Sequence, residues 1–231
     1  MNISMMKTRH GADVIRALME KNPATVLPSG DIRLPPARLS FPNLARPGKN
    51  MSDPAQPGKY SVNLLFAEGA DLSLLQAARE AALRDAFPNN PTGAGMRNPF
   101  RNQAEKVSPA EGGLNPKGTS LSGFVPGQPF IAPGSRNYRP HCYSLPIVNG
   151  VPTQVDEAQI ESVFYPGCWV IAVVNAYASK NQVNPGVYFG LQSVLKIMDD
   201  ESLGGGGGGA PNPAAFAGVN IDQGVNPASL F

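Results

Sequence analysis

Basic and aromatic side chains alternate along residues 97–139, in a region where 17 of the 53 residues from 88 to 140 are glycine or proline. Cations on an extended backbone can follow phosphates, and flat rings can stack on bases of any identity. This chemistry suits an unpaired nucleic acid strand. The candidates in this stretch are Arg97, Phe100, Arg101, Lys106, Lys117, Arg136, Tyr138 and Arg139. Alternatively, the aromatic residues only anchor a long loop to the body of the protein, which we expect of Phe124 and Phe130.

Four further candidates follow the loop: Tyr177, Lys180, Tyr188 and Lys196. Tyr188 stands two positions before Gly190, and the missing side chain leaves room for a flat group beside the ring. The alternative is an ordinary surface tyrosine. Trp169 lies in a strongly apolar run, and we expect it in the core.

Two long strands must position these four residues. The run from Trp169 to Tyr177 is rich in β-branched and aromatic residues, which predicts one long strand. After a turn at Asn184-Pro185-Gly186, residues 187–198 alternate with period two. The alternation places Val187, Phe189, Leu191, Leu195 and Ile197 on a core face and Tyr188, Gly190, Gln192, Val194 and Lys196 on an exposed face. We interpret the pair as the last hairpin of a β-barrel.

Earlier segments supply the rest of the predicted body. Prolines in residues 32–44 predict an interrupted strand at an edge or a bulge, and residues 59–66 read as a regular strand. Asp71 is expected to cap a helix that ends at Phe87 and packs on the barrel. Residues 145–148 form a short strand before an Asn149-Gly150 turn.

Charge is unevenly distributed along the chain. Residues 1–150 hold 17 Lys and Arg against 10 Asp and Glu, whereas residues 151–231 hold 2 against 7, and together they give the net charge of +2. A basic body with an acidic end favours a polyanion-binding protein whose tail competes for its own groove. Mere solubility is the alternative. Asp199, Asp200, Glu201 and Asp222 are assigned to this tail, and Leu230-Phe231 form an apolar tip suited to a pocket on a partner.

No residue pattern points to catalysis or to a cofactor. Cys142, Cys168 and His141 lack the spacing of a metal site, and neighbouring strand residues such as His141 and Cys142 point to opposite faces. Asp156, Glu157 and Glu161 are most simply a solvated turn. The glycine run 204–209 lacks the Lys-Ser/Thr of a phosphate loop. With two cysteines and no apolar run of 18 residues, we expect a soluble intracellular protein that is not an enzyme and has no membrane partner.

The order and spacing of several short pieces resemble the single-stranded-DNA-binding proteins of tailed bacteriophages. The pieces are residues 38–44, 60–65, 72–86, 98–101, 139–140, 163–167 and 186–192. The resemblance implies a mainly β fold, a five-stranded OB-fold barrel with one packed α-helix and long Pro/Gly-rich loops. It also implies sequence-independent binding of single-stranded DNA during phage replication or recombination, in the cytoplasm of a bacterial host.

The resulting division of the chain has three parts: an N-terminal appendage with a short helix (1–33), the DNA-binding domain (34–203) and a flexible, weakly acidic tail (204–231). Through Asp222, Leu230 and Phe231 the tail is expected to contact replication or recombination proteins. The sequence is compatible with both a monomer and a homo-oligomer. The alternative function is a β-rich virion structural protein, either a decoration or a tail subunit.

Overall fold

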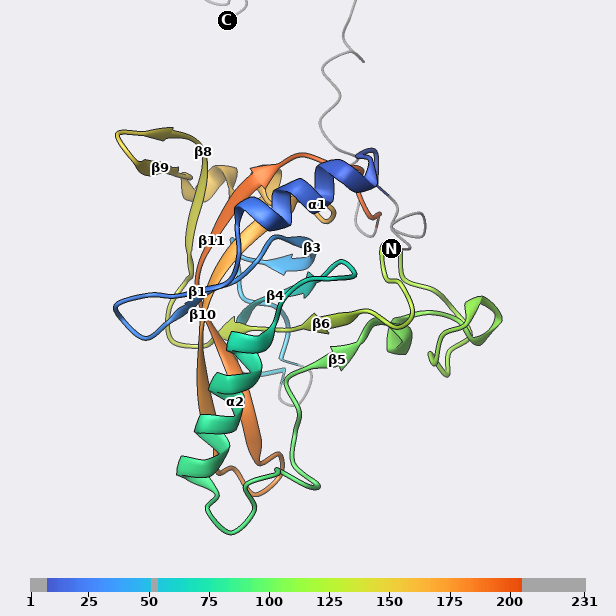
Figure 1. The fold of residues 1–231 in the computed structure, drawn as a ribbon, viewed down its shortest axis with the longest axis vertical. Coiled ribbons are helices and arrows are strands. Elements are labelled where there is room, and N and C mark those ends of the chain that lie inside the picture. The colour runs from blue at the N-terminus through green and yellow to red at the C-terminus, as the bar shows by residue number, and fades with distance from the viewer. Residues whose placement is uncertain (1–7, 51–53, 205–231) are drawn as a thin grey trace, which may run out of the picture.

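The computed structural model describes residues 8–50 and 54–204, and its ordered backbone is mainly β, arranged as one sheet (Figure 1). The strands are β1 (Thr25–Val26), β2 (Ile32–Arg33), β3 (Ala37–Asn43), β4 (Tyr60–Leu65), β5 (Arg101–Asn102), β6 (Pro129–Ile131), β7 (Gly134–Ser135), β8 (His141–Val148), β9 (Val151–Gln154), β10 (Trp169–Ser179) and β11 (Gly186–Met198). The helices are α1 (Ala12–Lys21), α2 (Ser73–Ala86) and α3 (Ile160–Val163), with 3-10 turns η2 (Gln103–Lys106), η3 (Pro109–Glu111) and η4 (Glu157–Gln159).

The sheet runs in the order β1-β2-β10-β3-β4-β7-β11-β8-β9, and β5 and β6 join it beside β4. Neighbours are antiparallel except where β11 meets β7 and β8, which it pairs in parallel. β10 also pairs with β11 along its whole length. The two predicted long strands therefore form the hairpin that the sequence indicates, and β8 and β9 form a second hairpin around Asn149 and Gly150, both in the left-handed region.

A bulge in β11 changes the expected faces of that strand. Val173 pairs with Ser193 but Val174 pairs with Leu191, so Gln192 is an extra residue. Because an extra residue reverses the alternation of side chains, the inward positions after it are even-numbered. The expectation for Val194 and Leu195 was therefore wrong: Val194 is fully buried and Leu195 only partly.

The prolines of this segment predicted a strand at an edge or a bulge. β3 is not at an edge, because it pairs with β10 on one side and β4 on the other. The irregularity appears instead as a bulge between Ser40 and Asn43. Within it, Phe41 has a φ of 47° and a side chain that is 49% exposed. A bulge next to Pro42 thus accommodates the proline inside the sheet.

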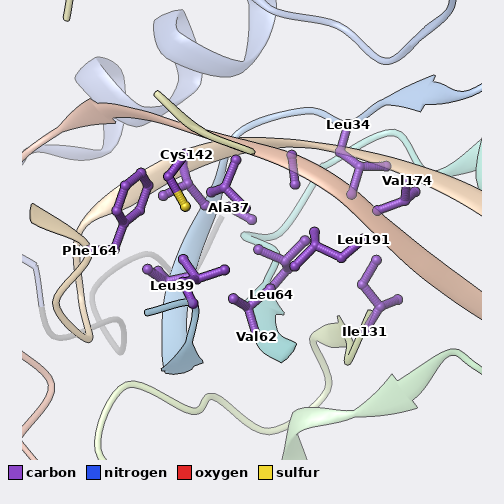
Figure 2. Packing of buried hydrophobic residues seen from close by; sticks show 14 of the residues in the cluster. Leu34, Ala37, Leu39, Val62, Leu64, Ile131, Cys142, Phe164, Val174 and Leu191 are labelled. Atoms are coloured by element: carbon purple, nitrogen blue, oxygen red, sulfur yellow. The ribbon is translucent and has the colours of Figure 1, made fainter. Parts of the chain in front are cut away.

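The main core lies between the inward faces of the strands and α2 (Figure 2). It contains Leu34, Leu39, Leu64, Ile131 and Leu191 among its buried members. The predicted helix is α2, which packs on β10 and β11 and buries Leu75 and Leu83. The expectation that Asp71 caps this helix was wrong, because the N-cap residue is Leu72 and α2 begins at Ser73. Asp71 lies one residue earlier, and its Oδ1 accepts a hydrogen bond from the backbone N–H of Ser73 at 2.9 Å.

A second, smaller core joins the N-terminal segment to the body. Ile15 of α1 is fully buried against Ala67, Val125 and Trp169. Trp169 is therefore a core residue as expected, but on the outer face of β10, beneath α1. The described part of the segment assigned as an appendage thus packs on the sheet and adds β1 and β2 to its edge.

Asp200 is the polar centre of this junction, although the sequence pattern assigned it to the acidic tail. Its side chain is fully buried and lies 3.2 Å from Arg38 Nη1, itself 1% exposed. It also accepts hydrogen bonds from Trp169 Nε1 at 2.8 Å and Thr8 Oγ1 at 2.6 Å, and from the backbone N–H of Arg9. The assignment of Asp200 to the tail was therefore wrong. Its carboxylate is part of the folded body, where these donors offset the free-energy cost of burying the charge.

The same contacts shift the pKa of Asp200. Burial by itself would raise this pKa, but the hydrogen bonds from Thr8 and Arg9 and the charge of Arg38 hold it below its ordinary value. The carboxylate is therefore ionised at neutral pH and pairs with Arg38.

No helix among the described residues is long and apolar enough to cross a membrane.

Replacing Asp200 with Asn should strongly destabilise the protein, since it leaves the buried Arg38 without its counter-charge. Breaking a buried pair in this way costs about 3–5 kcal/mol. Urea unfolding at pH 7 measures the loss. Asp13→Asn is the matched control, because it breaks an Asp–Arg contact whose carboxylate side chain is 93% exposed. Equal unfolding midpoints for the two variants would contradict a structural role for Asp200.

The advantage of the wild type over Asp200→Asn should depend on pH. A carboxyl group whose pKa is lower in the folded state contributes stability that is complete above its unfolded value, about 3.9, and is lost as the pH falls through the folded value. The difference in urea midpoint should be largest near pH 7 and shrink below about pH 4. A difference that stays constant down to pH 2 would show that the carboxylate charge is not involved.

Candidate nucleic-acid interface

A groove of about 570 Å³ lies on the outer face of the β10–β11 hairpin, between its turn, the start of β4 and the loop after β7. It is bordered by three cations, three tyrosines and several amide side chains. The lining residues are Lys59, Arg97, Gly134, Ser135, Arg136, Asn137, Tyr138, Asn175, Tyr177, Ser179, Asn181, Asn184, Tyr188, Gly190 and Gln192. None of these residues is acidic.

Two of the tyrosines form a stacked pair. Tyr177 of β10 and Tyr188 of β11 are directly opposite in the hairpin, so their rings share the outer face. The ring centroids are 5.9 Å apart and the planes differ by 22°. Burial, with the neighbouring Tyr188, raises the pKa of Tyr177, which is therefore neutral at physiological pH. Because Tyr177 is still 45% exposed, the pair offers a flat surface on which another ring could stack.

Arg97 joins the tyrosine pair from a separate segment of the chain. Its guanidinium carbon lies 5.5 Å from the centroid of Tyr188, a cation–π distance. The backbone holds it there: the N–H of Arg97 donates to Pro185 O at 2.9 Å, and Arg97 bridges to Gly186. Gly186 has a φ of 148°, and a Cβ at this position would lie 2.5 Å from the carbonyl oxygen of Arg97. Glycine is therefore required for the close approach.

A chain of hydrogen bonds orients the third tyrosine. The Tyr138 hydroxyl donates to Gln192 Oε1 at 2.7 Å, and Gln192 Nε2 donates to Asn175 Oδ1 at 2.8 Å. Asn175 lies opposite Gly190, where a Cβ would be only 2.2 Å from its Oδ1. The room beside Tyr188 that the sequence suggested for a ligand ring is therefore occupied by the amide of Asn175, and that part of the expectation was wrong.

The positive charges of Lys59, Arg97 and Arg136 lie close enough to repel one another. Burial lowers the pKa of Lys59, and the charges of Arg97 and Arg136 lower it further. No carboxylate lines the groove to offset this repulsion. A bound anion would remove the penalty, so the site is electrostatically prepared for phosphate groups.

The groove brings together five of the predicted residues: Arg97, Arg136, Tyr138, Tyr177 and Tyr188. Lys180 lines a neighbouring hollow that shares Tyr177 with the groove. The tail residues Asp222, Leu230 and Phe231 lie outside the described residues.

Two of the predicted contact residues, Phe100 and Arg101, have structural roles near β5 and β6. Phe100 packs its ring edge-to-face on Phe189 at 5.5 Å, and Arg101 pairs with Glu105 at 2.5 Å and lies over the ring of Phe130. Phe124 packs against Phe130, as expected of anchors. Lys106 lies in η2 and Lys117 in the loop that follows η3, and neither lines the groove.

Arg139 and Lys196 also contact other parts of the protein. Arg139 pairs with Glu157 and lies over the ring of Tyr60. Lys196 pairs with Asp199 at 2.6 Å and lies over Tyr165. Lys196 follows the bulge at Gln192, which separates it from the face that carries Tyr188.

Sequence reasoning missed Lys59, Asn175 and Gln192 as site residues. Strand alternation contained a signal for two of them, because Asn175 shares a face with Tyr177 and Gln192 was placed with Tyr188. Lys59 had no such signal, since its place beside Gly134 depends on the pairing of β4 with β7.

Among the described residues, no group of three His, Cys, Asp or Glu side chains could hold a metal ion. Both cysteines are buried and unpaired. Burial raises the pKa of Cys142 to about 11 and that of Cys168 to about 12, so both are thiols at neutral pH.

Comparison with known proteins places this geometry in a family. No curated protein sequence matches the chain. Among solved structures, the single-stranded DNA-binding protein from bacteriophage Enc34 in complex with ssDNA is similar, with a TM-score of 0.57 and 23% identity over 79% of this chain and 94% of that chain. A second structure of the Enc34 protein gives a TM-score of 0.55 and 21% identity over 85% of this chain and 94% of that chain. A structure of the Enc34 protein with a C-terminal truncation gives a TM-score of 0.57 and 20% identity over 78% of this chain and 92% of that chain.

These identities establish a shared fold. The family described as Enterobacter phage Enc34, ssDNA-binding protein, matches residues 31–223, which is most of the 231-residue chain. The chain therefore belongs to the Enc34 ssDNA-binding protein family.

Proposed function

We propose that the protein binds single-stranded DNA without sequence preference during phage DNA replication or recombination, in the cytoplasm of the host cell. The observation that carries the proposal is the groove in which Lys59, Arg97 and Arg136 accompany three tyrosines and no carboxylate. Family membership supports it, as does the similar fold of the Enc34 protein in complex with ssDNA.

The cations supply affinity that does not depend on base identity. Each phosphate they neutralise releases counterions from the strand, which makes binding weaker as the salt concentration rises. Because the three cations also repel one another, an incoming backbone relieves a cost already present in the free protein.

The tyrosines supply the contact with the bases. Tyr177 and Tyr138 are each nearly half exposed, at 45% and 44%, and Tyr188 supports Tyr177 from the adjacent strand. Base–aromatic stacking is tolerant of sequence because every base has a π-face. The side-chain amides of Gln192 and Asn175 are hydrogen-bonded to each other, and Gln192 also accepts a hydrogen bond from Tyr138. These amides therefore hold the Tyr138 ring in position and are less suited to hydrogen-bond the edges of bases.

We further propose that the sheet is an OB-fold barrel. Following the pairings from β10 through β3, β4, β7 and β11 leads back to β10, a circuit of five strands. Such a circuit is what a five-stranded barrel requires. In this reading residues 34–203 form the DNA-binding domain, and residues 204–231 form a tail that contacts replication or recombination proteins through Asp222, Leu230 and Phe231.

Fluorescence polarisation of a labelled oligo-dT strand at several salt concentrations tests the function. The wild type should bind the strand and prefer it to duplex DNA. The logarithm of its affinity should fall linearly with the logarithm of the salt concentration. A virion structural subunit, the alternative from the sequence, would show no preference for single strands. Absence of binding in dilute buffer would refute the proposal.

Arg136→Gln should weaken binding and reduce the magnitude of the salt slope by about 0.7, the value expected for one phosphate contact to a single strand. Lys117→Gln is the control, since it removes one positive charge from an exposed position outside the groove. The control should keep the wild-type slope. If both variants change the slope equally, the DNA follows the total charge of the protein and not this groove.

Tyr177→Ala should weaken oligo-dT binding by about 1–3 kcal/mol, the value of one base–aromatic stack. Tyr177→Phe keeps the ring and should bind like the wild type. Polarisation at fixed salt gives both affinities, and thermal melting verifies that the variants are folded. Equal weakening by Phe and Ala would assign the contribution to the hydroxyl and remove stacking from the mechanism.

A further inference from the structure

A second, apolar groove of about 440 Å³ lies between the bulge of β3, the loop before Phe124 and the segment around α3. Its lining residues include Phe41, Glu161, Phe164, Leu203 and Gly204. We call it the Phe41 groove. Phe164 and Leu203 are buried in its walls, at 1% and 2% exposure, so the groove is backed by the packed interior.

Phe41 stands at this groove in an unusual conformation. Its φ of 47° lies in the left-handed region, which is disfavoured for a bulky side chain. The β3 bulge turns the side chain outward, although its neighbours Leu39 and Ser40 are buried. Bulges commonly re-aim one side chain, and backbone strain tends to persist where a function needs it. Phe41 is 49% exposed and lines the groove, so its ring adds to the apolar surface that the groove offers.

We propose that the Phe41 groove binds a segment of the same chain, the residues around Phe216. The groove would receive the ring of Phe216, flanked by the small residues Ala215 and Ala217. This docking is separate from DNA binding and does not depend on it.

The position of the last described residue supports this occupant. Gly204 is itself a lining residue of the groove, so the following chain starts at the site. Phe216 comes 12 residues later, after a run of glycines. A glycine-rich stretch of that length has a root-mean-square span of about 17–21 Å. The effective concentration of Phe216 at the groove is then on the order of millimolar, so a weak intrinsic affinity is enough.

Charge also favours the Phe41 groove over the groove that we propose for DNA, which we call the DNA groove. Residues 204–221 contain no charged side chain. Glu161 is the single charged residue that lines the Phe41 groove, whereas three cations and no carboxylate line the DNA groove. A neutral, apolar segment can be buried in the first without an unpaired charge, but it offers nothing to neutralise the second.

The family match adds an independent observation. It continues to residue 223 and so includes Phe216, although the described residues end at 204. The matched range therefore includes position 216, while Leu230 and Phe231 lie beyond it.

Photo-crosslinking in the full chain, without DNA, tests the proposal. The photoreactive analogue p-benzoylphenylalanine replaces Phe216 in one protein and Phe231 in a control protein. After illumination, mass spectrometry should locate crosslinks from position 216 at residues 40–43, 121–122 or 161–166. The control at position 231 should label these residues at least fivefold less. Crosslinks from position 216 mainly to the DNA groove, or equal labelling of the Phe41 groove from both positions, would overturn the proposal.

Mixing isotopically heavy and light chains before illumination identifies the source of the segment. Crosslinks within one chain support the proposal, whereas crosslinks mainly between heavy and light chains would overturn it in favour of exchange between two copies.

A second variant tests the role of Phe41 without unfolding the protein. Phe41→Gly removes the ring and suits a positive φ, so its melting temperature should equal or exceed that of the wild type. The yield of crosslinks from position 216 to residues 161–166 should fall several-fold. An unchanged yield in this folded variant would overturn the proposal. Because the measurement contains no DNA, its outcome is independent of the proposed function.

Discussion

The buried carboxylate of Asp200 determines how the ends of the described chain meet the sheet. A single side chain accepts hydrogen bonds from Thr8, Arg9 and Trp169 and neutralises Arg38, so three separate parts of the chain converge on it. Desolvating a carboxylate and a guanidinium is costly, and the cost is recovered only when every partner is present. The network is therefore more effective at fixing one arrangement than at adding net stability. It also holds the end of β11, and with it the long hairpin that carries Tyr188.

The DNA groove follows the opposite rule. Arg38 has a buried counter-charge, but Lys59, Arg97 and Arg136 share a concave surface that no carboxylate lines. Repulsion among them is tolerable because the groove is open to water, which screens charge far better than the interior does. The stability provided by the hydrophobic cores offsets this local cost. The chain thus keeps a buried arginine whose charge is compensated apart from a groove whose three cations have no carboxylate beside them.

The long hairpin, the strand at 60–65, helix α2 and the β8–β9 turn were all predictable, because each depends on local periodicity or turn chemistry. The family resemblance came from short pieces in the right order, and the family match confirms it. Individual site residues were harder. Arg97 and Tyr188 line one groove, but the other basic candidates Arg101, Arg139 and Lys196 pair with Glu105, Glu157 and Asp199. Composition cannot distinguish a cation that is free for a ligand from one that is already neutralised, because the partner is set by the fold.

Two bulges explain most of the remaining differences between expectation and structure. In β11 the extra residue Gln192 lets Tyr188 face the groove while Val194 enters the core, so one strand serves two surfaces. In β3 the bulge turns Phe41 out of a strand whose other apolar residues are buried. Both irregularities interrupt a period-two pattern that would otherwise assign every second residue to one face. Each of these two bulges lies at a groove, so these two breaks in regular alternation let the sheet line a surface hollow as well as pack the core.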